Sequence, residues 1–288
     1  MGAKKVAVGG IEIANDRPFV FIGGPCVIEG EDATLANARA LKGICEGAGV
    51  PFIFKSSFDK ANRLSAASFR GHGIELGLTV LRRVRDEVGV PVLTDVHETS
   101  QVERVAEVAD VIQIPAFLCR QTDLVLEVAR SGRVVNVKKG QFISPWDMGS
   151  IIDKITSVGN ENIIITERGT SFGYQNLVVD FRSFHVLKEF GFPVCFDGTH
   201  STQLPGAAAG ASGGQREFVY PLTRSAIAQG IAALFWEVHE NPPAALSDAA
   251  TQMPLAEVGE KLSALKELDA FIKRGLEHSG AAHVKTHE

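Results

Sequence analysis

The feature that most constrains this chain is a regular alternation of short apolar runs with longer stretches of helical periodicity. Between the runs, apolar residues recur at spacings of three and four, as at Ile74, Leu78 and Leu81, which predicts amphipathic helices. Uninterrupted apolar strands are typically buried on both faces, and β–α alternation indicates parallel strands joined by right-handed crossovers. The runs predict eight strands, at 19–23, 51–55, 91–95, 111–114, 134–138, 163–167, 193–197 and 234–237.

Eight such units in 288 residues fit the α/β class and, within it, a (β/α)8 TIM barrel. A doubly wound sheet is the competing architecture, but it usually carries a glycine-rich nucleotide fingerprint after its first strand. Here the first strand leads into Gly-Gly-Pro-Cys at 23–26, which lacks the third glycine of that fingerprint. The sequence therefore predicts a barrel and gives no support for a dinucleotide cofactor.

The two ends of the chain differ from the repeating pattern. Apolar runs at 6–8 and 11–13 flank Gly9-Gly10, which predicts a β-hairpin within residues 1–15 that closes the bottom of the barrel. Residues 276–288 are polar, and we expect a disordered tail there. No repeat, low-complexity tract or linker interrupts the rest, so residues 1–288 are expected to form a single domain.

Charge and apolar length exclude several functional classes. The chain has 29 Lys+Arg against 34 Asp+Glu, a net charge of −5, whereas a nucleic-acid surface needs clustered excess positive charge. No apolar run reaches the roughly 18 residues of a membrane span, and the N-terminus lacks the apolar core of a signal peptide. We therefore expect a cytoplasmic protein with neither nucleic-acid nor membrane partners.

Active sites of (β/α)8 barrels lie where the strands end, because the βα loops converge there. Nearly every predicted strand delivers a polar or ionisable residue at this point. Each alone is weak evidence, since loops are polar in any protein, but their convergence predicts a site. These residues are Cys26, Lys55, Lys60, Asp95, His97, Gln113, Lys138, Lys139, Glu167, Arg168, Asp197, His200 and Glu237.

Five cations belong to this rim or its loops: Lys55, Lys60, Arg63, Lys138 and Arg168. Several cations meeting at one mouth of an acidic chain indicate substrates with more than one phosphate or carboxylate. Two anionic substrates would suit them. The alternative is that those at 60 and 63 merely decorate an exposed loop.

A second group mixes soft and hard metal ligands. Cys26, His200 and Glu237 follow the first, seventh and eighth strands, which become neighbours when a barrel closes, and Asp248 lies in the loop after the eighth. Thiolate, imidazole and carboxylates together suit Zn2+, Mn2+ or Fe2+. A buried thiol and a loop histidine beside unrelated carboxylates are the alternative.

The segment 198–214 is long and rich in Gly, Ala and Ser. It is either a mobile lid that closes over the mouth or simply a flexible loop.

Seven segments together resemble one enzyme family, 3-deoxy-D-manno-octulosonate 8-phosphate synthase, over residues 19 to 270. The sister family, 3-deoxy-D-arabino-heptulosonate 7-phosphate synthase, shares the barrel but typically carries KPRT where this chain has DKANR at 59–63. The segments are GGPCVIE (23–29), FKSSFDKANR (54–63), IQIPAFLCRQTDL (112–124), NVKKGQF (136–142), TERGTSFGY (166–174), VVDFRS (178–183) and FDGTHSTQLPG (196–206).

The resemblance implies that phosphoenolpyruvate condenses with D-arabinose 5-phosphate and water in lipopolysaccharide (KDO) biosynthesis, without an organic cofactor. It places Lys60, Lys138 and Arg168 on phosphoenolpyruvate with Gln113 nearby, and Asn62 and Arg63 on the pentose phosphate. Lys55 and Ser65 join the substrate-binding set, and Asp95 joins the catalytic residues Lys60, Asn62, Lys138 and Arg168. Family members are homotetramers in which Arg120 of one subunit reaches a neighbour's phosphate site.

The family has a metal-dependent branch with cysteine in the GPC element and a metal-independent branch with asparagine there. Cys26 places this chain in the first, and the family's ligand set maps onto Cys26, His200, Glu237 and Asp248. One departure is Leu64, which stands where the family usually has the first of two serines after DKANR. A weaker hold on the pentose phosphate is the expected result, with Ser65 or a backbone amide as compensation.

Three alternatives remain at this stage. The heptulosonate synthase or another phosphoenolpyruvate-dependent sugar-acid synthase, such as a sialic acid synthase, would use a different aldehyde. A catalytically silent barrel that binds sugar phosphates or a partner protein would use none. A Schiff-base aldolase would use Lys138 as its nucleophile.

Overall fold

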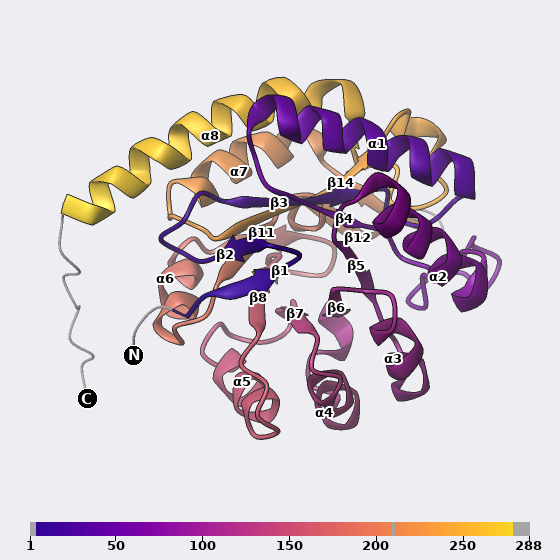
Figure 1. The fold of residues 1–288 in the computed structure, drawn as a ribbon, viewed down its shortest axis with the longest axis horizontal. Helices are drawn as coiled ribbons and strands as arrows, with labels where there is room; N and C mark the ends of the chain where they lie inside the picture. The colour runs from indigo at the N-terminus through magenta and orange to yellow at the C-terminus, as the bar shows by residue number, and fades with distance from the viewer. Residues whose placement is uncertain (1–3, 209–210, 279–288) are drawn as a thin grey trace.

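The computed structural model describes residues 4–208 and 211–278, and its centre is a closed barrel of eight parallel strands (Figure 1). Strands pair with their neighbours in chain order, and the pairing of the last with both the first and the seventh closes the cylinder. The predicted (β/α)8 barrel is confirmed. The strands are β3 (Val20–Gly24), β4 (Phe52–Lys55), β5 (Val92–Asp95), β6 (Val111–Ile114), β7 (Val134–Lys138), β8 (Ile163–Glu167), β11 (Val194–Asp197) and β14 (Ala233–His239).

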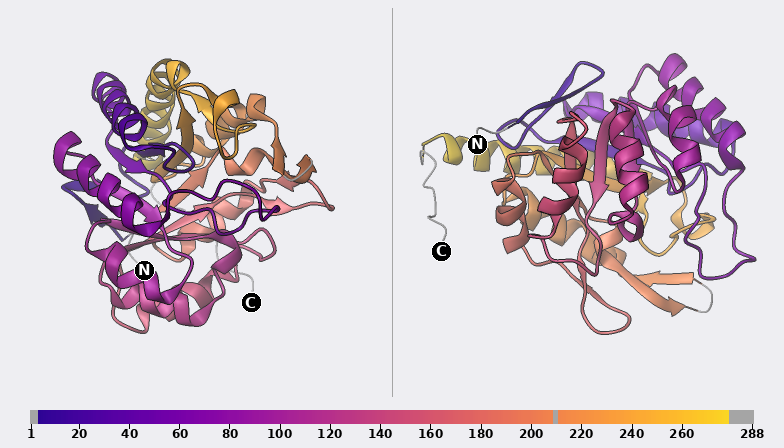
Figure 2. Two further views of the ribbon diagram at one scale, coloured as in Figure 1. Left: turned by 90° about the vertical axis from the view of Figure 1, so that its right-hand side faces the viewer. Right: turned by 90° about the horizontal axis from the view of Figure 1, so that it is seen from below.

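Helices surround this barrel and cover its outer face (Figures 1 and 2). Glycine ends the first of them: Gly49 adopts φ +61° and its N–H bonds the last turn, a left-handed conformation that side chains disfavour. The second helix continues into a π-helical turn, Val84–Val88. The helices are α1 (Glu31–Ala48), α2 (Gly73–Arg83), α3 (Thr99–Ala106), α4 (Thr122–Arg130), α5 (Met148–Thr156), α6 (Arg182–Glu189), α7 (Val219–Ile227) and α8 (Leu255–His278).

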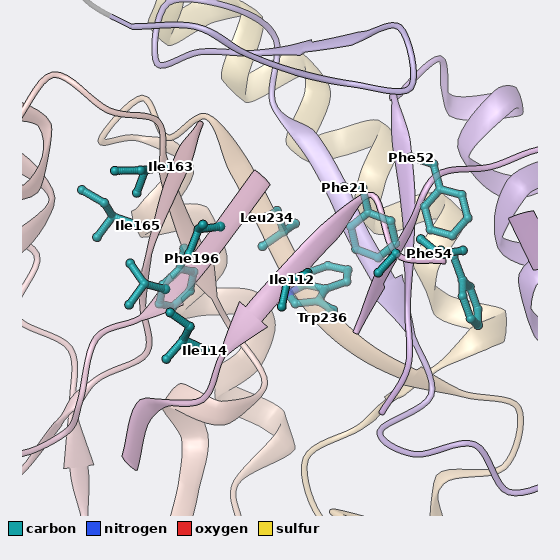
Figure 3. Close-up of a cluster of buried hydrophobic side chains, with 14 of the residues drawn as sticks. Phe21, Phe52, Phe54, Ile112, Ile114, Ile163, Ile165, Phe196, Leu234 and Trp236 are labelled. Atoms are coloured by element: carbon teal, nitrogen blue, oxygen red, sulfur yellow. The ribbon is translucent and has the colours of Figure 1, made fainter. Parts of the chain in front are cut away.

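The apolar residues of each strand divide between two cores because successive side chains point to opposite faces. One set faces the helices, where Phe21 meets Trp236 edge to face with ring centroids 5.8 Å apart (Figure 3). The other set, including Val20, Ile22 and Ile53, fills the barrel interior. Both sets are buried, which explains why the strands read as continuous apolar runs.

The predicted hairpin consists of β1 (Val6–Val8) and β2 (Ile11–Ile13), joined at Gly9-Gly10. Both glycines have positive φ, +52° and +83°, as a two-residue hairpin turn requires. Its apolar face packs on the interior residues at the amino ends of the strands. The hairpin therefore closes the bottom of the barrel, as the sequence predicted (Figure 2).

Two segments differ from expectation. Within 198–214, the structure forms a 3-10 turn (His200–Thr202) and an antiparallel hairpin of β12 (Gln203–Ala208) and β13 (Ala211–Gly214), on the side opposite β1–β2 (Figure 2). Small side chains give no periodic signal, so this pairing was not predictable. Helix α8 continues to His278, inside the predicted tail, while residues 279–288 of that tail lie outside the described residues.

Three further short strands complete the set of described strands: β9 (Thr170–Ser171), β10 (Leu177–Val178) and β15 (Met253–Pro254). The last pairs in parallel with the end of β14. Among the helices in the described ranges, none combines the length and apolarity needed to cross a lipid bilayer.

Candidate active site

A cavity of about 370 Å³ lies at the carboxyl ends of the strands, within the size range of small-molecule sites. It collects most of the residues predicted for the rim, although strands and loops far apart in sequence supply them. Those that line it are Lys55, Lys60, Asn62, Arg63, Asp95, His97, Gln113, Lys138, Arg168, His200 and Asp248. The cavity therefore lies at the carboxyl ends of the strands, where the sequence predicted a site.

Lys138, the last residue of β7, is held between a carboxylate and an aromatic ring. Its ammonium pairs with Asp197 at the end of β11 and lies 3.7 Å from the centroid of the Phe235 ring. Burial lowers the pKa of Lys138, although Asp197 counteracts it. Burial would raise the pKa of Asp197, but His200 and Lys138 outweigh it and hold that pKa well below its usual value. Asp197 is therefore ionised, and it fixes the position of Lys138.

Arg168 follows β8 on a turn that Glu167 shapes. The Glu167 carboxylate accepts the backbone N–H groups of Arg168 and Gly169, at 2.9 and 2.7 Å, and lies 3.4 Å from Lys139. The Arg168 guanidinium donates from Nη2 to Gln203 Oε1 at 2.7 Å, while its buried Nη1 has no partner in the described residues. Glu167 and Lys139 therefore support the turn, and Arg168 keeps donors for an anion.

Two lysines converge on Glu237, which lies near the carboxyl end of β14. Lys55 Nζ lies 3.0 Å from Glu237 Oε1 and 3.1 Å from the Cys26 carbonyl oxygen. Lys60 Nζ lies 3.5 Å from the same carboxylate oxygen. Burial would raise the pKa of Glu237, but His200 and the two lysines more than offset it and lower that pKa. Lys55 thus supports the site's own carboxylate, and it also lines the cavity in which a substrate contact was predicted.

Hydrogen bonds fix the polar residues of the opposite wall. The Asp95 carboxylate accepts from Ser57 Oγ at 2.5 Å and lies 3.0 Å from His97 Nε2. Gln113 Oε1 accepts from Asn136 Nδ2 at 3.1 Å, which sets the orientation of the Gln113 amide. These side chains reach the cavity already oriented, which limits the entropy lost when a ligand binds.

The four predicted metal ligands lie together beside the cavity. Ligand atoms of Cys26, Glu237 and Asp248 all lie within 4.8 Å of one another. His200 Nε2 lies 3.5 Å from Glu237 Oε1 and 3.7 Å from Asp248 Oδ2. His200 Nδ1 lies 2.6 Å from Asp197 Oδ2, and this contact orients the imidazole ring so that Nε2 faces the cluster.

The chemistry of this cluster fits a divalent cation. Glu237 Oε2 is buried and has no hydrogen-bond partner in the described part of the chain. Burial, with Asp248 and Glu237 nearby, raises the pKa of Cys26 well above its ordinary value. Burial and the two carboxylates therefore disfavour the Cys26 thiolate, and a bound cation would stabilise that thiolate and give the unpartnered Glu237 oxygen a partner.

Three residues singled out from the sequence lie differently from the rest. Ser65 does not line the cavity, and its hydroxyl accepts the backbone N–H of Ala67 at 3.3 Å. Arg120 is exposed and outside the cavity of its own chain. Leu64 lines the cavity with its side chain 63% exposed. The predicted compensation for Leu64 by the Ser65 hydroxyl therefore receives no support from this geometry.

Several residues of the site had no substrate-binding, catalytic or metal-binding role predicted from the sequence. Asp197 appeared only as a strand end, yet it links Lys138 to His200. Gln203, the first residue of β12, and Ser247, in the loop after β14, line the cavity from segments whose sequence has no period to single them out. Gln252 connects two loops by its amide, a contact between residues 226 positions apart that no local pattern signals.

Comparison with known proteins agrees with this geometry. A sequence model described as the DAHP synthetase I family matches residues 3–274. The chain is 57% identical to the 2-dehydro-3-deoxyphosphooctonate aldolase of Geotalea daltonii, over 94% of this chain and 99% of the relative. Proteins of the same name from Geobacter sulfurreducens and Syntrophotalea carbinolica are 55% and 53% identical, over 94% of this chain and 99% and 98% of theirs.

That name is a synonym of the octulosonate 8-phosphate synthase indicated by the sequence motifs, so the resemblance is confirmed. DAHP denotes the product of the sister heptulosonate enzyme, whose name the broader family carries. The chain belongs to the DAHP synthetase I family and, within it, to the 2-dehydro-3-deoxyphosphooctonate aldolases.

Proposed function

We propose that this chain condenses phosphoenolpyruvate with D-arabinose 5-phosphate and water to give 3-deoxy-D-manno-octulosonate 8-phosphate and inorganic phosphate, for lipopolysaccharide synthesis. The observation that carries the proposal is one cavity in which three cations meet beside a thiol–imidazole–carboxylate cluster. The aldolase name of the relatives supports the same chemistry.

Two groups of residues in the cavity bind the two anionic substrates. Lys60, Lys138 and Arg168 hold the phosphate and carboxylate of phosphoenolpyruvate, with the oriented amide of Gln113 beside them. Asn62 and Arg63 line the same cavity from the loop after β4 and hold the pentose phosphate. Holding two reactants of like charge in attacking geometry contributes roughly 7 kcal/mol or more to lowering the barrier.

The proposed reaction forms no covalent bond between the enzyme and a substrate. Carbon 3 of the enol phosphate attacks the aldehyde carbon, whose oxygen takes a proton and becomes a hydroxyl. Positive charge develops at carbon 2, and water adds there and loses a proton. The resulting hemiketal phosphate collapses to the ketone as its C–O bond breaks and phosphate leaves. The fixed carboxylate of Asp95, which lines the cavity, stabilises the developing positive charge.

The metal cluster lies where the aldehyde end of the pentose phosphate would be oriented. Cys26, His200, Glu237 and Asp248 would hold a divalent ion, which when bound supplies Lewis-acid polarisation and a fixed point for orienting an oxygen. Asp197 orients the His200 ring so that Nε2 faces the other ligands, and Lys55 keeps Glu237 ionised and in place. These residues thus maintain the site through their own hydrogen bonds.

Assembly and location belong to the same proposal. We propose a homotetramer in which Arg120 reaches the pentose phosphate site of a neighbouring subunit, because in its own chain it is exposed and outside the cavity. We also propose that the protein acts in the cytoplasm.

The aldehyde specificity decides between this function and its nearest alternative. With the purified chain, phosphoenolpyruvate consumption is followed with arabinose 5-phosphate, erythrose 4-phosphate or N-acetylmannosamine. We expect turnover with arabinose 5-phosphate. Preference for erythrose 4-phosphate would favour the heptulosonate synthase named by the family description. Sugar-phosphate binding without turnover would indicate a binding protein, and borohydride trapping of Lys138 with pyruvate would indicate a Schiff-base aldolase.

The assignment of Lys138 to substrate binding can be tested separately. Lys138→Met removes an ammonium held in the cavity, and we expect kcat/KM to fall at least about 100-fold, as for lost charge-stabilising donors in other sites. Arg104→Met is the matched control, because Arg104 pairs with Glu75 on the exposed outer face. Equal activity of the two variants would contradict the assignment of Lys138 to substrate.

A further inference from the structure

Among the four proposed metal ligands, Asp248 lies farthest along the chain from the barrel strand that precedes it. The other three are at the ends of barrel strands or in a turn directly after one, whereas Asp248 lies in the loop between β14 and β15. It has φ +46°, the one positive φ outside glycine in the described residues. A non-glycine residue in this region costs free energy and persists only where its surroundings enforce it.

The Gln252 side chain supplies such a restraint. It is fully buried, and its Oε1 accepts the backbone N–H of Cys26 at 3.2 Å. Its Nε2 donates to the backbone carbonyl of Ser247 at 2.8 Å. One amide therefore joins the backbone of the thiol ligand to the residue immediately before Asp248.

The backbone of Gln252 is itself anchored on both sides. Its N–H donates to the Asp248 carbonyl at 3.2 Å, which closes a turn over residues 248–252. The next residue, Met253, pairs with Val238 in the β14–β15 ladder, one residue beyond Glu237. Gln252 thus has a fixed relation to three segments that carry Cys26, Glu237 and Asp248.

We infer that Gln252 is a positioning residue that sets the spacing of Cys26 and Asp248 across the cation site. The inference rests on the metal site of the proposed function and goes beyond its four ligands. An amide suits the role because one group both accepts from an N–H and donates to a carbonyl. Neither a carboxylate nor an aliphatic side chain at this position can do both.

Residues that orient metal ligands through hydrogen bonds typically change metal affinity about 10- to 100-fold when they are replaced. Gln252→Leu removes both hydrogen bonds at similar volume. We expect its dissociation constant for Co2+, measured by titrating the chelator-treated protein at fixed pH, to rise by that factor. The thiolate-to-Co2+ absorption should saturate later and with changed intensity.

Asn160→Leu is the matched control. Asn160 is also a buried amide that bridges two backbone carbonyls, those of Ala129 and Arg133, but it precedes β8 at the amino end of the barrel. We expect it to lower the melting temperature of the metal-free protein and to leave Co2+ affinity unchanged. A general loss of stability would weaken Co2+ binding in both variants, whereas a positioning role weakens it only in Gln252→Leu.

Gln252→Asn covers the case in which Gln252→Leu does not fold. It keeps a buried amide but is one methylene shorter, so it cannot reach the Cys26 N–H and the Ser247 carbonyl together. Wild-type Co2+ affinity in either folded Gln252 variant, or an equal loss in Asn160→Leu, would overturn the inference. If the wild-type chain binds no Co2+, Mn2+ or Zn2+, the metal part of the proposed function is wrong and the inference falls with it.

Discussion

At Leu64, an apolar side chain lines the cavity next to the polar side chains of Asn62 and Arg63, and it is 63% exposed there. It stands where the resembling family usually has serine, so one hydroxyl donor near the pentose phosphate is replaced by a hydrocarbon. A hydrogen bond to a charged group contributes about 1.5 to 3 kcal/mol, although solvent screening at an exposed position reduces this.

Leu64→Ser is therefore expected to lower the KM for arabinose 5-phosphate several-fold and to leave the KM for phosphoenolpyruvate unchanged. Steady-state kinetics with each substrate varied in turn measure both. Leu76→Ser, a partly exposed leucine on α2 outside the cavity, provides the control and should change neither constant. Unchanged affinity for the pentose phosphate in Leu64→Ser would show that Leu64 costs the site nothing.

A site residue was predictable from the sequence where it lies at the end of a predicted barrel strand. Lys138, Glu237 and Asp95 end buried apolar runs, so their places at the mouth follow once the barrel is inferred. Ser65 was not predictable in this way, because the loop after β4 turns its hydroxyl to Ala67. The bridge made by Gln252 depends on how two loops meet after the barrel closes, which residue type and spacing do not encode.

At the scale of elements, the β1–β2 hairpin fills the end of the barrel away from the cavity. Ile13 is fully buried against the interior residues of the strands. We expect Ile13→Ala to lower the free energy of unfolding by about 2 to 5 kcal/mol, because it removes buried methyl groups and leaves a void. Urea unfolding measures the change, and kcat should be unaffected because the hairpin lies far from the mouth.

Glu12→Ala provides the comparison on the same strand. Glu12 is exposed and pairs with Lys5 and Arg17, and exposed ion pairs typically contribute no more than about 1 kcal/mol. If Ile13→Ala cost no more than Glu12→Ala, the hairpin would be an appendage rather than the closure of the barrel.

The elements were predicted best where apolar periodicity is strong. All eight barrel strands and the β1–β2 turn match, with β14 extending to His239 beyond the predicted end at 237. The β12–β13 hairpin was missed because glycine and alanine carry no face preference, and its pairing rests on backbone hydrogen bonds. The last turn of α8 was missed because Leu276 is the one apolar residue among residues 276–278, which is too little to show a helical period.

At the scale of the whole molecule, the pairing of β14 with both β3 and β11 makes the barrel depend on both ends of the chain. We propose that residues 1–288 fold as one domain on this ground. Lys188, near the end of α6, offers a pH-dependent probe of its stability. Burial, with Lys273 nearby, lowers the pKa of Lys188 to about 8. An unfolded lysine titrates near pH ~10.4.

Between these two values the unfolded chain binds a proton that the folded chain has lost, so this group makes the free energy of unfolding rise with pH. Below about pH 8 both states are protonated, and the folded state bears the full cost of the buried charge. Lys188→Met should therefore be more stable than the wild type at pH 7, by at most roughly 3 kcal/mol. The advantage should shrink toward pH 10 in calorimetry or urea unfolding, and a pH-independent difference would contradict this account.

The central claim is that a divalent ion is held by Cys26, His200, Glu237 and Asp248 beside the anion cavity. Anomalous diffraction from crystals of the active protein grown with Mn2+, recorded with elemental analysis of the same preparation, tests it most directly. We expect one anomalous peak per chain, surrounded by the Cys26 Sγ, the His200 Nε2 and the carboxylates of Glu237 and Asp248. Full turnover by a preparation with no divalent metal, or a peak elsewhere in the barrel, would contradict it.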